Sequence, residues 1–374
     1  MSRRTVIAAV CLAAAVGAGV WMLSHSRALS YPPLHVPADN PMSEQKAVLG
    51  RWLFYDRRLS VNGSVSCADC HRQAFAFADP RARSVGATGE RTTRNAMTLT
   101  NVAYNGRYTW ANDSLKTLEQ QALVPLTSSH PLEMGIVEQE QPAMLARLRG
   151  DARYNALFRA AFPEETDPVS LRNVVRAIST FVRTLVSFEA PYDRFLRGDK
   201  AALTDDAQRG MTLFRSNELK CARCHDGINF RMTPGHRTSQ ADETVAYHNT
   251  GLYNLAGDGS YPASDRGLFE VTHVPADMGR FKAPTLRNVA VTAPYMHDGS
   301  IATLDAVIDH YAAGGRAIAS GPDAGEGFFN PHKSQFVSGF QLTPGQRREL
   351  LAFLQSLTDQ AFLTNPAFAD PFHE

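Results

Sequence analysis

The sequence CADCH occupies residues 67–71, and CARCH repeats its spacing at residues 221–225, in a chain of 374 residues with only five cysteines. In the pattern Cys-x-x-Cys-His, two cysteines attach a porphyrin through thioethers, and the adjacent histidine binds its iron from one face. This composition gives about 0.002 such matches by chance. Two matches therefore predict two covalently bound haem c groups, held by Cys67, Cys70, His71, Cys221, Cys224 and His225.

Disulfide redox motifs and zinc sites share part of this pattern. A redox pair has no use for the trailing histidine. A zinc site built from two Cys-x-x-Cys pairs 154 residues apart would leave both histidines unused. Haem attachment is therefore the favoured interpretation.

The segments that precede the two motifs are also related. EQKAVLGRWLF (44–54) and DAQRGMTLF (206–214) share Ala, Gly, Leu and Phe in the same register. Ser43 and Thr204 stand where the caps of two helices are expected. We predict an all-α protein with two cytochrome c-like haem domains, 29–200 and 201–374, after an N-terminal segment 1–28.

Two further helices are predicted from their own residues. Residues 171–185 carry an apolar stripe at helical spacing and would close the first domain. Thr343 can cap a later helix, with Pro344 at its first position and Gln346 completing a capping box. Strand patterns are weak, and stretches rich in Gly, Pro, Asn and Asp predict long ordered loops at 226–285 and 314–342.

The first 28 residues have the pattern of an export segment. Arg3 and Arg4 precede an apolar run from Val6 to Leu23, and residues 26–28 offer a cleavage site. The run is also nearly long enough to span a bilayer, so a signal peptide and an N-terminal membrane anchor both remain open. Either one predicts a periplasmic protein, and a net charge of +1 does not indicate nucleic acid or an anionic membrane surface as a partner.

A resemblance to a known family rests on four phrases: LGRWLFYDRRLSVNGSVSCADCH, RNAMTLTNVAYNGRYTW, LVPLTSSHPLEMG and FKAPTLRNVAVTAPYMHDGSIATLDAVIDHYAAGG. They resemble the bacterial di-haem cytochrome c peroxidase and MauG family. Loop phrases such as WANDSLKTLEQQALVPL and YHNTGLYNLAGDGSYPASDRGLF look most like its MbnH subgroup. Enzymes of that subgroup oxidise a tryptophan of a small secreted partner, MbnP, to kynurenine.

The resemblance implies a different task for each haem. The haem at His71 would meet peroxide, and the haem at His225 would exchange electrons. Peroxidases of the family carry a removable distal histidine eight residues before the asparagine of their RN phrase, whereas here Ala87 stands eight residues before Asn95. Because alanine cannot bind iron, we expect the first haem to be open to peroxide without prior reduction.

The far ligand of the second haem in the peroxidases is a methionine 14 residues after the histidine of the HDG phrase. Counting 14 residues from His297 reaches Tyr311, and a tyrosine ligand, typical of the MauG branch, stabilises oxidised iron. The residues alone leave alternatives open. Tyr311 also fits an apolar core stripe, and three other ligand candidates lie nearby in the sequence: His310, Met296 and Met278.

Splitting peroxide requires a group that moves a proton between its oxygens and a dipole that stabilises the separating charge. The resemblance implies Glu133 as the distal carboxylate and Gln121, followed by Pro125, as the distal amide. Taken singly, a loop glutamate is usually solvated. Gln120 could exchange roles with Gln121, and His130 could either join the proton path or lie at the surface.

The resemblance also implies a redox relay and an ion site. Trp110 lies nine residues after Asn101, the register of the tryptophan between the two haems of this family, where an indole can relay a hole. The calcium ion of the family is held by one asparagine side chain and two backbone carbonyls, which map to Asn95, Thr292 and Pro294.

We therefore expect a periplasmic di-haem c-type oxidoreductase that reacts with hydrogen peroxide. It would form a high-valent state shared by both haems and oxidise an aromatic residue, tryptophan in the first instance, of an MbnP-like partner. The alternative is a cytochrome c peroxidase that takes electrons from a small cytochrome or cupredoxin. A non-catalytic electron carrier would have two saturated haems, which Ala87 argues against.

Overall fold

The computed structural model describes residues 31–231 and 246–373. The predicted export segment, residues 1–28, lies outside the described residues. Within the part of the chain that the structure describes, no helix is both long enough and apolar enough to cross a membrane.

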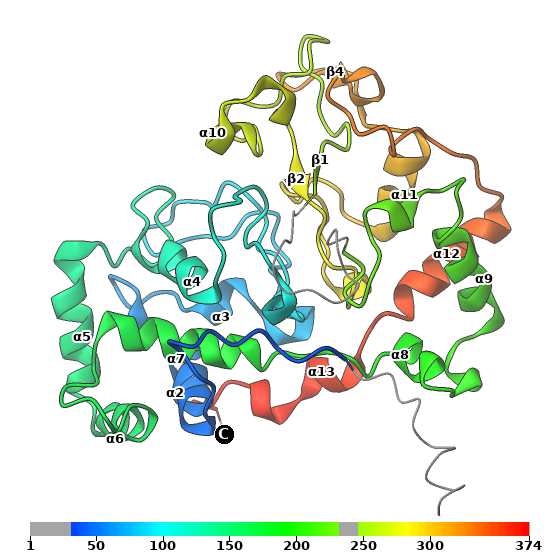
Figure 1. The fold of residues 1–374 in the computed structure, drawn as a ribbon. Helices are drawn as coiled ribbons and strands as arrows, with labels where there is room; N and C mark the ends of the chain where they lie inside the picture. The colour runs from blue at the N-terminus through cyan, green and yellow to red at the C-terminus, as the bar shows by residue number, and fades with distance from the viewer. Residues whose placement is uncertain (1–30, 232–245, 374) are drawn as a thin grey trace, which may run out of the picture.

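The described chain is mostly helical, as the sequence predicts (Figure 1). The helices of the first half are α2 (Glu44–Tyr55), α3 (Cys67–Cys70), α4 (Leu118–Thr127), α5 (Gln141–Arg149), α6 (Ala152–Ala161), α7 (Leu171–Arg183) and α8 (Pro191–Leu196). Those of the second half are α9 (Asp205–Phe214), α10 (Phe269–Thr272), α11 (Leu304–Ala312), α12 (Pro344–Gln355) and α13 (Gln360–Thr364). Strand β1 (Tyr247–His248) pairs with β2 (Phe281–Lys282), and β3 (Ala317–Ile318) pairs with β4 (Gly325–Glu326), both antiparallel.

The predicted helix caps are confirmed. The side chains of Ser43, Thr204 and Thr343 each accept a hydrogen bond from the backbone three residues on, at the starts of α2, α9 and α12. Gln346 completes the predicted capping box at Thr343. These helices begin where the sequence predicts because a cap is a local interaction that needs no tertiary contact.

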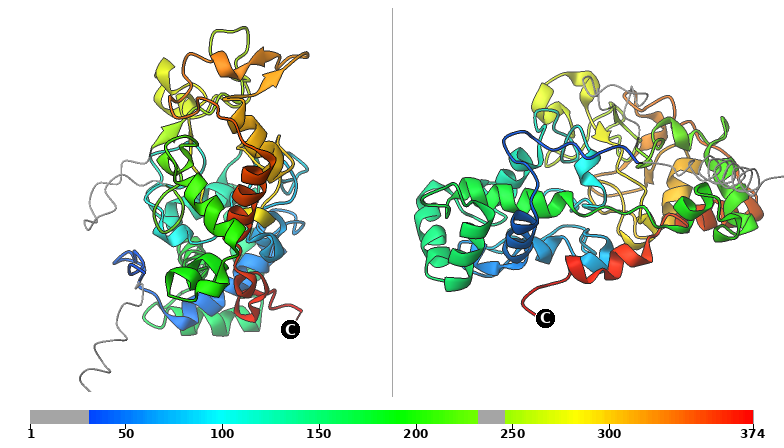
Figure 2. Two further views of the ribbon diagram at one scale, coloured as in Figure 1. Left: turned by 90° about the vertical axis from the view of Figure 1, so that its right-hand side faces the viewer. Right: turned by 60° about the horizontal axis from the view of Figure 1, so that its bottom comes forward.

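The repeated glycine lies at the same helix crossing in both halves. α2 packs across α7, where a Cβ atom at Gly50 would lie 1.9 Å from the carbonyl oxygen of Ala177. α9 packs across α12, where a Cβ atom at Gly210 would lie 1.9 Å from the carbonyl oxygen of Glu349. The two helix pairs lie toward opposite sides of the molecule (Figures 1 and 2). The duplicated phrase thus marks one packing arrangement used twice, in which only glycine lets the backbones approach so closely.

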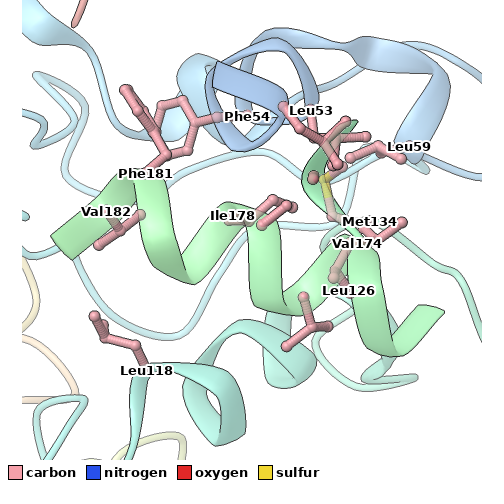
Figure 3. Packing of buried hydrophobic residues seen from close by; sticks show 14 of the residues in the cluster. Leu53, Phe54, Leu59, Leu118, Leu126, Met134, Val174, Ile178, Phe181 and Val182 are labelled. Carbon is pink, nitrogen blue, oxygen red and sulfur yellow. The ribbon is translucent and has the colours of Figure 1, made fainter. Parts of the chain in front are cut away.

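A large hydrophobic cluster forms around α2, α4 and α7, and a separate one forms around α9 and α12. In the first cluster Phe54 and Phe181 face each other with ring centroids 5.3 Å apart, and Leu118 and Leu126 approach α7 from α4 (Figure 3). After α12 the chain returns to this first cluster, where the ring of Phe362 lies 5.7 Å from that of another core residue, Phe77. The end of the chain, assigned from the sequence to the second domain, therefore packs on the first core.

A second internal repeat joins the halves. TLTNVA (98–103) and TLRNVA (285–290) each contain an asparagine with left-handed backbone conformation, Asn101 and Asn288. The backbone N–H of Asn101 donates to the carbonyl oxygen of Leu185, just after α7, and that of Asn288 to Leu357, just after α12. The side chain of Asn288 also donates to Thr100 and Ser187 in the first half. The side-chain hydrogen bonds of Asn288 are buried and cross from one half to the other, so they fix the two halves against each other.

Candidate active site

The first cavity brings the first motif together with three predicted catalytic residues. Cys67, Cys70 and His71 line it, together with Gln121, Pro125 and Glu133. The rest of its wall is mainly apolar and comes from the first core, including Phe54, Leu118, Leu126, Ile178 and Val182. An apolar slot beside two thiols and an imidazole is the setting that a covalently attached porphyrin requires.

His71 is oriented by its own loop. Its Nδ1 donates to the carbonyl oxygen of Phe77, 2.8 Å away, and Phe77 adopts a positive φ of 59° to present that oxygen. Burial lowers the pKa of His71, which keeps the ring neutral. A neutral ring with its proton on Nδ1 leaves Nε2 as an iron ligand.

Glu133 lies in the connection between α4 and α5 and is held there by the loop that follows the first motif. The N–H of Ala87 donates to the carbonyl oxygen of Glu133 at 2.7 Å, and the N–H of Leu132 donates to the carboxylate of Glu90 at 3.1 Å. Burial in the cavity wall raises the pKa of Glu133 to about 7. A carboxyl group with this pKa can both accept and return a proton near neutral pH.

The choice between Gln120 and Gln121 follows from helix α4. The side chain of Gln120 completes a capping box with Thr117 and lies at the surface. Gln121 points to the other side and lines the cavity, where its Oε1 is buried without a hydrogen-bond partner in the protein. Pro125, four residues on, has no N–H to donate to the carbonyl of Gln121 and lies on the same wall. The unpartnered amide oxygen can accept a hydrogen bond from a ligand in the cavity.

Among the described residues that line the first cavity, His71 is the only histidine. Met134 also lines it and belongs to the first core, packed near Leu53 and Leu59 (Figure 3). His130 is 87% exposed and pairs with Glu90 at the surface, 3.1 Å away. Of the two predicted places for His130, the structure therefore shows the one at the surface.

The second cavity contains the second motif and the predicted tyrosine. Cys221, Cys224, His225 and Tyr311 all line it. Nδ1 of His225 lies 3.0 Å from the carbonyl oxygen of Phe230, which again has a positive φ, and burial lowers the pKa of His225 to about 4. The geometry repeats that of His71, so both cavities fit a haem with a histidine ligand. Because the two cysteine pairs line separate cavities, they cannot bind one zinc ion together.

The structure distinguishes Tyr311 from the other candidate ligands by which of them line the second cavity. The apolar stripe proposed as an ordinary core face is the wall of this cavity, since Leu304, Val307, Ile308 and Tyr311 all line it. His310 is buried but is not among the lining residues. Of the two methionine candidates, Met296 lines the cavity and Met278 does not. Burial raises the pKa of Tyr311, so the phenol would lose its proton only to a strong Lewis acid such as iron.

Trp110 and the three predicted calcium ligands, Asn95, Thr292 and Pro294, line the second cavity as well. The indole Nε1 of Trp110 donates to the carbonyl oxygen of Asn95 at 2.8 Å. Residues 95–98 face this second cavity, whereas Leu99 faces the first. Trp110 is therefore bonded to the segment that lies between the two cavities.

Comparison with known proteins gives consistent matches. A family model described as di-haem cytochrome c peroxidase matches residues 44–201. The methylamine utilization protein MauG of Methylorubrum extorquens is 35% identical over 331 residues, 88% of this chain and 83% of that protein. The cytochrome c551 peroxidase of Pseudomonas aeruginosa is 33% identical over 320 residues, 85% of this chain and 80% of that protein. A solved structure described as a MauG-like protein associated with microbial copper homeostasis is 47% identical, with a TM-score of 0.89, and covers 93% of this chain and 99% of that one.

The fold and the two motif-lined cavities define a di-haem oxidoreductase. The chain belongs to the di-haem cytochrome c peroxidase and MauG family, and it is a peroxide-dependent enzyme. Family membership implies two haem groups, hydrogen peroxide as a reactant, and a protein as either substrate or electron donor.

Proposed function

We propose that the enzyme uses hydrogen peroxide to oxidise an aromatic side chain of a small secreted partner protein like MbnP. The proposed side chain is a tryptophan. The observation that carries this proposal is that Tyr311, and not a methionine at that position, shares the second cavity with His225. The 47% identity to a MauG-like protein associated with copper homeostasis supports the same subgroup. We further propose a periplasmic location and a domain boundary near residue 200.

The haems would be attached through thioethers to Cys67 and Cys70, and to Cys221 and Cys224, with His71 and His225 as ligands. When bound, their irons supply the chemistry that takes oxidising equivalents from peroxide. Tyr311 would be the second ligand of the iron at His225. An anionic oxygen ligand favours oxidised iron, whereas a thioether favours reduced iron.

Glu133 would move the proton in the first cavity. Its carboxylate accepts a proton from one oxygen of hydrogen peroxide and returns it to the other, so that water can leave. Gln121 would orient the peroxide, because its buried amide has an oxygen without a partner in the protein. At the position of the removable distal histidine of the peroxidases this chain has Ala87, so no histidine from that position would compete with peroxide. Burial matches the pKa of Glu133, about 7, to this exchange at neutral pH.

Trp110 would relay oxidising equivalents between the two cavities, since it lines one of them and is hydrogen bonded to the segment that separates them. We also propose a calcium ion at Asn95, Thr292 and Pro294. These residues offer one amide and two backbone oxygens on the same wall, and calcium prefers oxygen ligands completed by water.

The overall reaction balances with peroxide as the only oxidant. Two molecules of hydrogen peroxide supply four oxidising equivalents. Two oxygen atoms add across the C2–C3 bond of the indole as it breaks, and two water molecules leave. Hydrolysis then releases the formyl carbon as formate and leaves kynurenine. The substrate tryptophan need not enter either cavity, because electrons can be removed from it over a distance through the protein.

The test is to incubate the haem-loaded enzyme with peroxide and an MbnP-like partner, and to analyse the partner by peptide mass spectrometry. We expect kynurenine at one tryptophan, with formate released in equal amount. Tyr311→Phe should abolish this product. Tyr295→Phe removes a phenol from the same cavity, one whose hydroxyl donates to Val289, and should retain the product. An unmodified partner, together with rapid peroxide consumption when a reduced cytochrome or cupredoxin is supplied, would establish the peroxidase alternative.

A further inference from the structure

Lys282 carries a buried amine that has few partners in the surrounding protein. Its side chain is 2% exposed, and the residue lines the second cavity. The amine donates to the carbonyl oxygen of Arg107 at 2.8 Å. Among the described residues no carboxylate forms an ion pair with it. An ammonium group has three donors, so this arrangement leaves most of its hydrogen-bonding capacity unused in a place where water is scarce.

His248 lies on the neighbouring strand and also has a buried nitrogen that lacks hydrogen-bond partners. Strand β1 pairs with β2 so that Tyr247 opposes Lys282 and His248 opposes Phe281. The ring of His248 lines the same cavity, and its Nε2 is buried without a hydrogen-bond partner. Two nitrogen-bearing side chains on adjacent strands therefore line one cavity. The amine of Lys282 has a single carbonyl acceptor, and Nε2 of His248 has no partner among the described residues.

The other lysine and histidine side chains on the described wall have contacts of their own. Lys220 donates to the hydroxyl of Ser338 at 2.8 Å. His225 uses Nδ1 for the carbonyl oxygen of Phe230. The ring of His297 stacks on that of Phe281, with centroids 3.6 Å apart, and its nitrogens are not among the buried atoms without a partner. Lys282 and His248 are thus the pair on the described wall that still requires an acceptor, and an anion would satisfy both.

We propose that Lys282 and His248 form a binding site for a carboxylate inside the second cavity, and that this carboxylate is a propionate of the haem attached at Cys221 and Cys224. A haem is the group that the cavity fits, and each haem carries two propionates on one edge. The proposal rests on the proposed attachment of the second haem. It deepens that proposal by assigning two residues outside the attachment motif to the cofactor.

The site would also connect the haem edge to Trp110. The backbone N–H of Lys282 donates to the carbonyl oxygen of Trp110 at 2.8 Å. A propionate bound by the side chain of Lys282 would therefore be linked to Trp110, the proposed relay, through Lys282 alone. Lys282 is accordingly a positioning residue, and its effect should be seen in the haem itself.

The first variant is Lys282→Met, and the matched control is Lys333→Met. Lys333 is also a partly buried lysine, but its amine donates to the carbonyl oxygens of Gly314 and Val337, and it is not among the residues lining this cavity. Both substitutions remove one positive charge. Lys282→Arg retains a positive charge, and His248→Phe removes the second nitrogen while it keeps an aromatic ring beside Phe336.

The readouts are the reduction potential of the second haem and the propionate bending bands in its resonance Raman spectrum. We expect Lys282→Met to lower the potential and shift a propionate band, and His248→Phe to shift the same band. Lys333→Met and Lys282→Arg should leave the band in place. An unshifted band in both Lys282→Met and His248→Phe, with two haems still bound, would overturn this inference alone. A wild-type protein without haem in this cavity would instead overturn the proposed attachment, which haem content measured beforehand would reveal. If Lys282→Met fails to accumulate, His248→Phe decides by the same band.

Discussion

Replacing Glu133 by glutamine is the sharpest perturbation of the first cavity. Among the described residues lining that cavity Glu133 is the one acidic side chain, and glutamine keeps its size while it removes the titrating group. The loop that positions it should persist, because its known hydrogen bonds run through the backbone of Glu133 and through Leu132. The variant therefore separates proton transfer from the shape of the site.

Burial raises the pKa of Glu133 from 4.5 to about 7. This difference corresponds to about 3 kcal/mol by which folding disfavours the ionised form. The folded state binds the proton of this carboxyl group more tightly than the unfolded state does. The stabilisation from Glu133 is therefore fully present below the unfolded pKa of 4.5 and is lost as the pH rises through the folded pKa of about 7. Glu133→Gln, which never ionises, should match wild type in stability at pH 4 and exceed it by up to about 3 kcal/mol at pH 8.

The same titration predicts the kinetics. About half of the Glu133 side chains are ionised at pH 7, so the rate of the wild-type reaction with peroxide should rise with pH up to about 7 and then level off. Glu133→Gln should react about 100- to 10,000-fold more slowly and lose this dependence. Stopped-flow absorbance between about pH 5 and pH 9 measures both. The control Glu138→Gln, at an exposed glutamate of the same connection, should behave as wild type. Wild-type rates with an unchanged profile in Glu133→Gln would refute the assigned proton transfer.

Three further predictions concern the second cavity and the helix crossings. Tyr311→Phe should keep both haems attached but remove the coupled response of both irons to peroxide, as followed by rapid-scan absorbance, and an unchanged response would remove Tyr311 from the iron. Trp110→Phe should slow the response of the second haem by about tenfold or more relative to the first, and equal rates would show that Trp110 is not the relay. Gly210→Ala should lower stability by about 3 kcal/mol or more in thermal unfolding, because its Cβ would meet a backbone oxygen at 1.9 Å. Gly150→Ala, whose Cβ would come no closer than 3.4 Å to a neighbour, should change stability by less than about 1 kcal/mol, and equal effects of the two would contradict the packing argument.

Features encoded by neighbouring residues were predictable from the sequence. Ser43, Thr204 and Thr343 cap their helices through hydrogen bonds to residues only three positions away, so their sequence signal suffices. The haem motifs are equally local, and the duplicated Gly50 and Gly210 are explained by one crossing geometry. Where chemistry requires a fixed local spacing, the pattern alone predicts it.

Features that depend on tertiary position could not be predicted in the same way. Gln120 and Gln121 are adjacent and chemically identical, and only the capping box of α4 decides which one reaches the cavity. Lys282 and His248 lie on two-residue strands that are too short to show a periodicity, so their common cavity becomes visible only in the fold. The TLTNVA and TLRNVA repeat could have been recognised from the sequence, because its letters nearly match.

The central claim is that the first haem is open to peroxide and that Tyr311 binds the second. Low-temperature EPR of the oxidised protein, before and after one equivalent of peroxide, tests both parts at once. We expect one high-spin and one low-spin ferric signal at rest, and the loss of both on adding peroxide without a stoichiometric organic radical. Two low-spin signals that peroxide leaves unchanged would contradict the account, because the face opposite His71 would then be blocked.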